Sequence, residues 1–230
     1  MTEIVPGVYQ VDGVNGHAFI IVDNGITVID TGMGGDKKIL EMVNKLGYTP
    51  ADIKQIIITH CHVDHIGGLR ALKDASGATV MAGDADADVI EGKKPTAYPK
   101  MPFPISIIML ILRNFIKARP TPVDRRLKDG DVIPVLGGLK VVGLPGHSSG
   151  SIGLYCPSQK LFFSGDALRM KGDDFIKPLN YDAYKAQCLA SIKKMGALDY
   201  EIMLSGHSDP IMADASKKVA AYAEKLSTEG

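Results

Sequence analysis

Four potential metal ligands occur within six positions, directly after an apolar run, in the segment QIIITHCHVDHIGG (55–68). They are His60, His62, Asp64 and His65. Imidazole and carboxylate groups are preferred ligands of zinc and of similar divalent ions. Alternate residues of an extended segment point the same way, so His60 and His62 can reach one ion. Asp64 and His65 fall on the following turn and are placed for a second ion. The sequence therefore predicts a fold in which a buried strand ends at a metal site.

Three further candidate ligands follow other apolar, strand-like runs. They are His147 in VVGLPGHSSGSIG, Asp166 in LFFSGDAL and His207 in EIMLSGHSDP. Functional residues concentrate where a rigid strand passes into a loop. We therefore expect these side chains to converge on the first cluster. The remaining histidine, His17, stands alone and is given no role.

The order of apolar runs predicts two strand-rich halves, each followed by helices. The expected strands are Val5–Val11, His17–Val22, Ile26–Asp30, Gln55–Thr59, Ala78–Ala82, Val132–Val135, Lys140–Leu144, Ser151–Cys156, Leu161–Ser164 and Glu201–Leu204. The expected helices are Lys37–Leu46, Gly67–Ala75, Asp84–Glu91, Tyr181–Met195 and Ala213–Leu226. This pattern favours an α/β architecture with sheet packed on sheet and helices outside. A length of 230 residues and a hydrophobic content of 45% suit one domain over residues 1–230.

The charge balance and the cysteine content limit the classes of partner and compartment. Lys plus Arg and Asp plus Glu both number 26, so no bulk attraction to nucleic acid is expected. A small-molecule substrate is the expected partner. Three cysteines are too few for a disulfide framework, and the first residues lack a basic, apolar export signal. Both features favour the cytoplasm.

The segment from about 92 to 128 differs from the rest of the chain. It holds nine basic residues, one acid and six prolines. Within it, PISIIMLILRNFIKA (104–118) predicts a helix with a wide apolar face that is shorter than the ~20 apolar residues a bilayer requires. We interpret 92–128 as a helical insertion that forms a lid or pocket wall for an apolar or anionic acyl substrate. A homodimer interface, contact with a membrane surface through 104–118, or simple packing on the domain remain alternatives.

The motifs VIDTG, THCHVDHIGG, LPGHSSGSIGLY, FFSGDAL and LSGHSDP occur in the order seen in the metallo-β-lactamase superfamily, which this chain resembles. The resemblance implies an αββα sandwich with the site along one edge of the two sheets. It implies a first ion held by His60, His62 and His147, and a second held by Asp64, His65 and His207. Asp166 would bridge the two ions. Asp30 in VIDTG would support the site from behind, with a strand-end turn residue as the alternative.

By this resemblance the chain is expected to be a dinuclear metal-dependent hydrolase. Two ions about 3.5–4 Å apart share a hydroxide, because the pKa of metal-bound water falls toward ~7. That hydroxide would attack an ester, thioester or lactone bond, with Asp64 orienting it or relaying a proton to the leaving group. Zinc is the expected metal, with iron and manganese as alternatives.

Several branches of the superfamily remain open. The ligand set suits thioester hydrolases of the glyoxalase II type and lactonases with an apolar acyl pocket. Iron-dependent persulfide dioxygenases would use His60, His147 and Asp166, and a non-catalytic metal-binding protein is a third class. Arg169 and Lys171 are candidates for binding a substrate carboxylate, with ordinary surface charge as the alternative.

Overall fold

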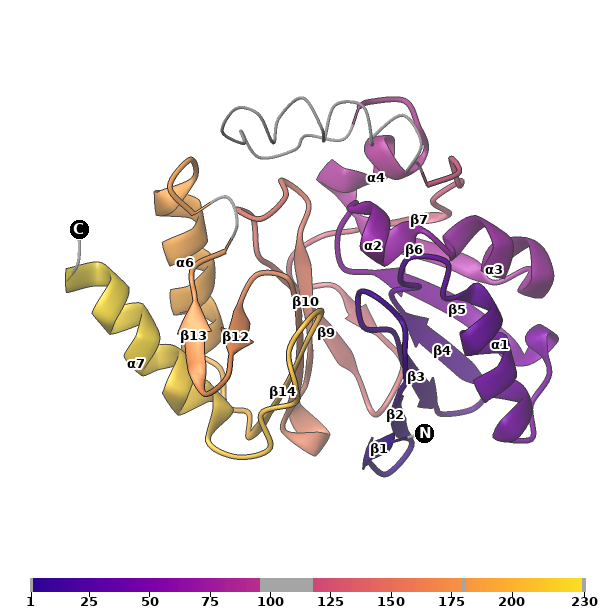
Figure 1. Cartoon of the computed structure of the whole chain (residues 1–230), viewed down its shortest axis with the longest axis horizontal. Helices are drawn as coiled ribbons and strands as arrows, with labels where there is room; N and C mark the ends of the chain where they lie inside the picture. The colour runs from indigo at the N-terminus through magenta and orange to yellow at the C-terminus, as the bar shows by residue number, and fades with distance from the viewer. Residues whose placement is uncertain (1, 96–117, 179–180, 229–230) are drawn as a thin grey trace.

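The computed structural model describes residues 2–95, 118–178 and 181–228. Two sheets pack face to face, and helices cover the outer face of each sheet (Figure 1). The chain therefore forms the four-layer αββα sandwich that the sequence predicts.

The first sheet contains seven strands in sequence order, and its later strands are parallel. The strands are β1 (Thr2–Val5), β2 (Val8–Gln10), β3 (Phe19–Val22), β4 (Ile26–Ile29), β5 (Ile53–Ile58), β6 (Thr79–Gly83) and β7 (Arg125–Leu127). Strands β1 to β4 pair antiparallel, whereas β4 to β7 pair parallel. The parallel strands bring their carboxyl ends to one edge of the sheet.

The second sheet contains five strands in the order β14-β11-β10-β9-β8. The strands are β8 (Val132–Ile133), β9 (Leu139–Gly143), β10 (Ile152–Cys156), β11 (Leu161–Gly165) and β14 (Ile202–Ser205). Strand β10 is antiparallel to both β9 and β11, and β11 is parallel to β14. Strands β9, β11 and β14 therefore end at the same edge. A separate ribbon pairs β12 (Arg169–Lys171) with β13 (Asp174–Ile176).

The helices divide between the two outer faces (Figure 1). Those beside the first sheet are α1 (Asp36–Lys45), α2 (Val63–Ile66), α3 (Leu69–Ser76) and α4 (Asp84–Ile90), with the 3-10 turn η1 (Pro50–Asp52). Those beside the second sheet are α6 (Lys185–Gly196) and α7 (Ala215–Thr228), and η2 (Pro157–Gln159) joins two of its strands. Within the described ranges, no helix combines the length and apolar character needed to cross a bilayer.

Strand alternation divides the apolar side chains among three layers. Ile56 faces the helices over the first sheet, whereas its neighbour Ile57 faces the space between the sheets. Phe163 joins the same inter-sheet layer, whereas Phe162 stacks on Tyr200 beneath α6 and α7. Because successive side chains of a strand point to opposite faces, runs that are apolar throughout suit strands buried on both sides.

One expected strand and one expected helix differ from the structure by more than two residues. The segment Val5–Val11 is not one strand, because a turn at Pro6 and Gly7 separates β1 from β2 and Gly7 adopts a φ of +79°. The helix expected from Tyr181 begins at Lys185. Tyr181 instead packs with the apolar residues beneath the helix.

The end of the expected 92–128 insertion belongs to the core fold. Residues Arg125–Leu127 form β7, which pairs with β6, so this part is not helical. Strand β7 lies at the edge of the sheet and begins with two arginines, so it lacks the alternation of apolar and polar residues by which a strand is normally recognised. Arg126 and Lys94 form ion pairs with Asp88 of α4. The expected helix at 104–118 lies almost wholly outside the described residues, which resume at residue 118.

Candidate metal centre

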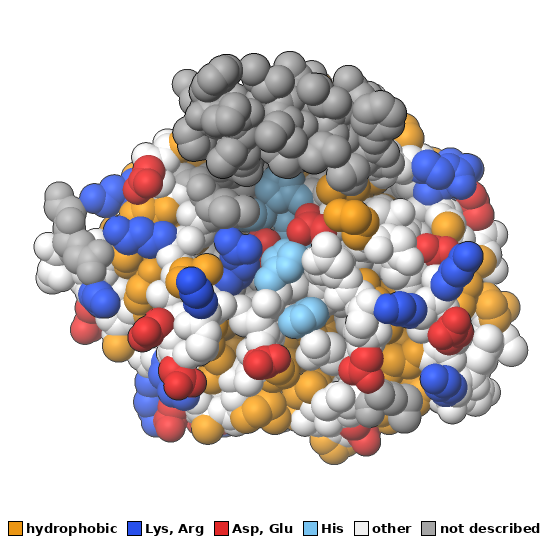
Figure 2. Space-filling model, in the orientation of Figure 1, with side chains coloured by type: hydrophobic (Ala, Val, Ile, Leu, Met, Phe, Trp, Pro, Cys, Tyr) orange, Lys and Arg blue, Asp and Glu red, His pale blue; other side chains and the backbone are white. Residues whose placement is uncertain are grey.

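The candidate ligands gather at one edge of the sandwich, where strands from both sheets end. His60 and His62 follow β5, and Asp64 and His65 lie on α2 directly after them. From the other sheet, His147, Asp166 and His207 follow β9, β11 and β14 respectively. Figure 2 shows histidine side chains in a hollow of this face, with acidic and basic side chains beside them.

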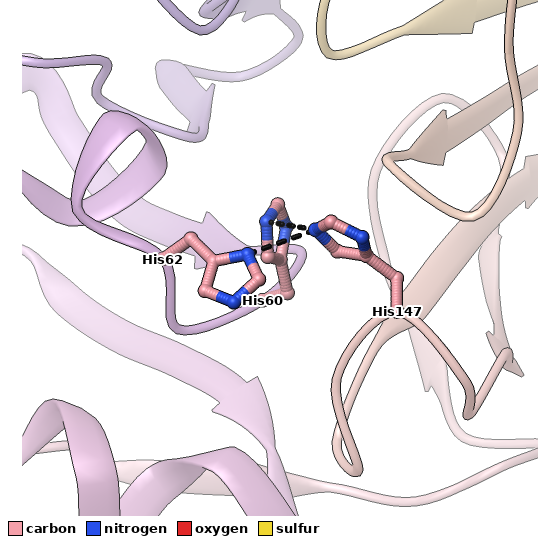
Figure 3. Close-up of side chains that lie close together, drawn as sticks. All are labelled: His60, His62 and His147. Carbon is pink, nitrogen blue, oxygen red and sulfur yellow. Dashed lines mark hydrogen bonds between the residues drawn. The ribbon is translucent and has the colours of Figure 1, made fainter. Parts of the chain in front are cut away.

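His60, His62 and His147 form the first group (Figure 3). The His147 Nε2 atom lies 2.8 Å from His62 Nδ1 and 3.2 Å from His60 Nε2. One ring nitrogen from each residue lies within 4.8 Å of the others. The rings therefore point at one position.

Asp64, His65 and His207 form the second group, and their candidate ligand atoms also lie within 4.8 Å of one another. The His207 Nε2 atom is 3.1 Å from Asp64 Oδ2 and 3.4 Å from His65 Nε2. His65 is fully buried, whereas His207 and Asp64 are partly exposed. This group therefore forms the more open side of the centre.

Asp166 lies between the two groups. Its Oδ2 atom is 3.6 Å from His147 Nε2 and 3.3 Å from His207 Nε2, and its Oδ1 atom is 3.5 Å from His65 Nε2. Asp166 also forms a third set with His60 and His65. The seven side chains are thus one continuous cluster rather than two separate sites.

The donor set fits divalent metal ions. Asp166 Oδ1 is buried and has no hydrogen-bond partner among the described residues, although an ionised carboxylate oxygen accepts bonds strongly. The facing imidazole nitrogens and carboxylate oxygens are the ligand types of zinc and similar ions. A metal ion would satisfy the buried oxygen and the facing nitrogens together.

Asp30 supports the cluster from behind. It is 2% exposed and has a φ of +55°, in the left-handed region. His65 Nδ1–H donates to Asp30 Oδ2 over 2.8 Å, and the Thr59 hydroxyl donates to the same oxygen over 2.6 Å. His60 Nδ1 lies 3.1 Å from that hydroxyl. These bonds leave Nε2 of both histidines directed toward the centre.

The two groups differ in protonation. Burial lowers the pKa of His147 to about 3 and holds the pKa of His60 well below its usual value. Hydrogen bonds to Asp166 and Asp64 raise the pKa of His207 to about 9. Burial opposes charge on His65, but Asp30 and Asp166 outweigh it and raise its pKa to about 10. The first group is therefore neutral near pH 7, whereas the second carries protons balanced by carboxylates.

Asp86 joins the two loops of the first group, and sequence reasoning did not select it. It is 2% exposed and accepts hydrogen bonds from Cys61 N over 2.9 Å, from Ser148 Oγ over 2.6 Å and from Gly150 N over 2.8 Å. Cys61 lies between His60 and His62, and Ser148 follows His147. One sequence signal could have identified Asp86. It stands four positions before Ile90, so both residues lie on the core-facing side of α4, where an acidic residue is unusual.

A glycine permits the close approach of the last loop. A Cβ atom on Gly206 would lie 2.2 Å from Asp166 Oδ1 and 2.6 Å from His65 Cε1. The sixth histidine, His17, reaches the same loop, where its Nδ1 lies 3.1 Å from Ser205 O and its backbone N–H donates to Gly206 O. His17 therefore helps to position the His207 loop without being one of the grouped residues.

The two candidate substrate residues lie on the β12–β13 ribbon. Lys171 is exposed, whereas Arg169 is partly buried and its positive charge contributes to the lowered pKa of His147. Two cavities adjoin the cluster. One of about 560 Å³ is lined by His207, Met170 and Lys218, and another of about 480 Å³ is lined by His147, Ser149 and Tyr184. Both offer space for a small molecule beside the histidines.

Comparison with curated proteins finds several relatives named hydroxyacylglutathione hydrolase. The chain is 28% identical over 196 residues to a hydroxyacylglutathione hydrolase of Cereibacter sphaeroides, which covers 83% of this chain and 62% of that protein. It is 29% identical over 157 residues to a hydroxyacylglutathione hydrolase of Rhodobacter capsulatus, covering 67% and 48%. The chain thus spans less than two thirds of the length of these relatives.

Solved structures share the fold over nearly the whole chain. A motif variant of a metallo-beta-lactamase from Cronobacter sakazakii has a TM-score of 0.74 at 23% identity, covering 99% of this chain and 94% of that chain. A metallo-beta-lactamase family protein of Thermus thermophilus has a TM-score of 0.72 at 21% identity, covering 99% and 80%. The model of the metallo-beta-lactamase superfamily matches residues 11–207, which include every residue of the cluster. The chain therefore belongs to the metallo-beta-lactamase superfamily.

Proposed function

We propose that this protein is a hydrolase that uses two divalent metal ions, zinc being the expected metal, on an ester, thioester or lactone bond. The observation that carries the proposal is the convergence of five histidines and two aspartates from both sheets, with ligand atoms within 4.8 Å in each group. His60, His62 and His147 would hold one ion, and Asp64, His65 and His207 the other. Asp166, which lies between the groups, would contact both.

The reaction adds water to the acyl carbon. The C–O or C–S bond breaks, and the products are a carboxylic acid and an alcohol or thiol. Bound divalent ions supply hydroxide near neutral pH and polarise the acyl oxygen. Asp64 is partly exposed, and its Oδ2 contacts His207. Its second oxygen would take the proton that the attacking water releases and pass it to the leaving group.

The proposed bond type agrees with the names of the curated relatives. A hydroxyacylglutathione is a thioester, and relatives with that name match up to 83% of this chain. We therefore rank thioesters first among the candidate substrates. Lactones come next, because a lactone is a cyclic ester and the same metal ligands would serve its hydrolysis.

A mononuclear iron enzyme that oxidises persulfides is the second candidate. His60, His147 and Asp166 lie close together, with 3.2 Å between the two Nε2 atoms and 3.6 Å from His147 Nε2 to Asp166 Oδ2. Two histidines and a carboxylate suit iron(II) in enzymes that use oxygen. Oxygen uptake with glutathione persulfide, measured on the iron-loaded protein, separates this activity from hydrolysis.

The test is hydrolysis of a substrate panel by the metal-loaded protein. The panel contains S-lactoylglutathione, an N-acetylcysteamine thioester, a γ-lactone and a p-nitrophenyl ester. Loss of a residue that supports a metal ligand lowers metal affinity or activity by about 10–100-fold. Loss of the ligand itself, in His60→Ala or His207→Ala, should therefore lower kcat/KM by at least about 100-fold. The matched control is Asp199→Asn, because the Asp199 side chain is 76% exposed and, among the described residues, forms an ion pair with Lys160 alone.

The outcomes separate clearly. The hydrolase is supported if the wild type and Asp199→Asn hydrolyse at least one ester or thioester that neither histidine variant hydrolyses. Full activity in both His60→Ala and His207→Ala would overturn the assignment of the cluster to catalysis.

A further inference from the structure

The loop that joins β2 to β3 is bonded to the loop that carries His207, although the two loops belong to different sheets (Figure 1). Two hydrogen bonds join them, and both come from His17. Its backbone N–H donates to Gly206 O over 2.7 Å, and its Nδ1 lies 3.1 Å from Ser205 O. A carbonyl oxygen can only accept, so Nδ1 carries a proton and donates it. The first sheet therefore holds the backbone of the two residues that precede His207.

The residue before His17 approaches the opposite side of the same metal group. Gly16 is buried and has a φ of +74°, and a Cβ atom there would lie 1.9 Å from Asp64 O. Only a residue without a side chain fits so close to the backbone of α2. Asp64 and His207 come from different sheets, and their side chains meet at 3.1 Å. Two adjacent loop residues thus bear on both of these candidate ligands.

The β2–β3 loop is itself held in place. Met33 N–H donates to Asn15 O over 2.9 Å, which fixes the loop to the turn after β4. The ring of His17 packs edge-on against Phe19, with 6.3 Å between ring centroids, and Phe19 packs against Phe163 between the sheets. A support that is already ordered can hold ligands at a set separation before an ion binds.

The first group is supported differently. Asp86 joins the loop of His60 and His62 to the loop of His147 through its bonds to Cys61 N and Ser148 Oγ. The bonds of His17 and the close approach of Gly16 act on the second group instead. Damage at the β2–β3 loop should therefore affect one ion and spare the other.

We propose that His17 is a positioning residue of the second metal group. It fixes the His207 loop relative to Asp64 and so determines whether the centre holds two ions or one. The inference rests on the proposed function and adds a residue that belongs to none of the grouped ligand sets. Residues that orient a ligand through a hydrogen bond affect metal affinity without touching the ion.

The test separates the hydrogen bond of His17 from the bulk of its ring. His17→Asn keeps a side-chain N–H donor close to the position of Nδ1. His17→Phe keeps an aromatic ring against Phe19 but removes the donor, and His17→Ala removes both. Gly16→Ala and Gly13→Ala form a matched pair, because their φ values are +74° and +70°. A Cβ atom on Gly13 would meet the flexible end of the Lys38 side chain rather than the backbone of α2.

The measurement is zinc titration of the metal-free proteins by calorimetry. His60→Ala and His207→Ala show which affinity belongs to which group. Loss of a residue that supports a ligand lowers metal affinity by about 10–100-fold, and we expect this loss for the second ion in His17→Phe and His17→Ala. The affinity for the first ion should stay unchanged, and His17→Asn should recover most of the loss. Gly16→Ala should weaken the second ion more than Gly13→Ala does.

Cobalt(II) gives an independent readout, because its visible absorption depends on coordination geometry. The absorption that His207→Ala removes should change in His17→Phe and be restored in His17→Asn. The absorption that His60→Ala removes should be the same in all His17 variants.

Two results would overturn the proposal. One is equal affinity of the wild type and His17→Phe for the second ion. The other is an equal loss of affinity for both ions, which would mean that His17 supports the fold and not the second group. If Gly16→Ala does not fold, the His17 variants still decide. Metal binding is measured without a substrate, so a wild type that binds two ions but hydrolyses no ester or thioester overturns the proposed hydrolase alone.

Discussion

The Oδ2 atom of Asp30 lies 2.8 Å from Nδ1 of His65. The same oxygen accepts the Thr59 hydroxyl, which in turn lies 3.1 Å from Nδ1 of His60. One carboxylate thus fixes the ring orientation of a histidine in each group. Carboxylates placed behind metal-binding histidines orient the rings and strengthen them as ligands. Asp30 also has a φ of +55°, a conformation that non-glycine residues rarely adopt.

Asp30→Asn should weaken metal binding while the fold is retained. The amide cannot accept from His65, Thr59 N and the Thr59 hydroxyl as an ionised carboxylate does. We expect a loss in metal affinity of about 10–100-fold, measured by competition with a chromophoric chelator. Asp199→Asn is the control at an exposed position. Equal affinity for the wild type and Asp30→Asn would show that His65 is oriented without this carboxylate.

Gly206→Ala should displace two candidate ligands. The added methyl would lie 2.2 Å from Asp166 Oδ1 and 2.6 Å from His65 Cε1, and neither buried side chain can move freely. We expect fewer bound ions per chain and a loss of activity of at least tenfold, comparable with the loss of a supporting residue.

A matched glycine on another strand of the same sheet controls for the loss of backbone freedom. Gly143→Ala adds a methyl whose nearest contact, Asp129 Cβ, is at an ordinary 3.4 Å. Elemental analysis of both variants checks the result. Full metal content in Gly206→Ala would mean that the His207 loop can shift at little cost.

Asp86→Asn should loosen the first group without touching any ligand. Asp86 bonds to Cys61 N and Ser148 Oγ, and therefore couples the His60 and His62 loop to the His147 loop. We expect weaker binding at the first group, which zinc titration followed by calorimetry would report as a lower affinity for one of the two ions. Ser148→Ala, which removes the 2.6 Å bond to Asp86 and the 2.7 Å contact with Ser151 Oγ, should have a smaller effect.

The control for Asp86 lies on the same helix. Asp84→Asn alters a side chain that is 51% exposed and lies near Arg126. If Asp86→Asn changes the unfolding temperature but leaves both affinities unchanged, the residue stabilises α4 without positioning the ligands.

Removal of metal should destabilise the folded chain. The ligand groups exist only when both sheets are assembled, so ions bind the native state and not the unfolded one. At free zinc about 1,000-fold above Kd, one ion adds about 4 kcal/mol, and a chain of this size then unfolds about 8–16 °C higher. Differential scanning calorimetry with and without EDTA measures this difference. The shift should shrink in His60→Ala, and no shift in the wild type would contradict metal binding at the cluster.

Local pattern was sufficient to predict that these side chains converge and that sheet packs on sheet with helices outside. Each ligand follows an apolar strand, and His60, Asp166 and His207 all stand where a buried run gives way to glycine or polar residues. Parallel strands then bring such positions to one edge. Most element boundaries differ from the sequence prediction by one or two residues, because the ends of helices and strands depend on tertiary contacts.

Residues whose partners are distant in sequence could not be predicted in the same way. Asp86 acts on groups 25 and 62 positions away, and nothing in its own segment indicates them. The need for glycine at position 206 arises from the close approach of Asp166 and His65 in the folded protein. Strand β7 contains two arginines, and only its pairing with β6 makes it part of the sheet.

The number and identity of bound ions test the proposed centre most directly. Protein purified without added metal, then dialysed with a small excess of zinc, should contain two divalent ions per chain by elemental analysis. His60→Ala and His207→Ala should each contain fewer. A single iron ion, with the group of Asp64, His65 and His207 empty even after zinc is offered, would contradict the dinuclear hydrolase and favour oxygen chemistry at His60, His147 and Asp166.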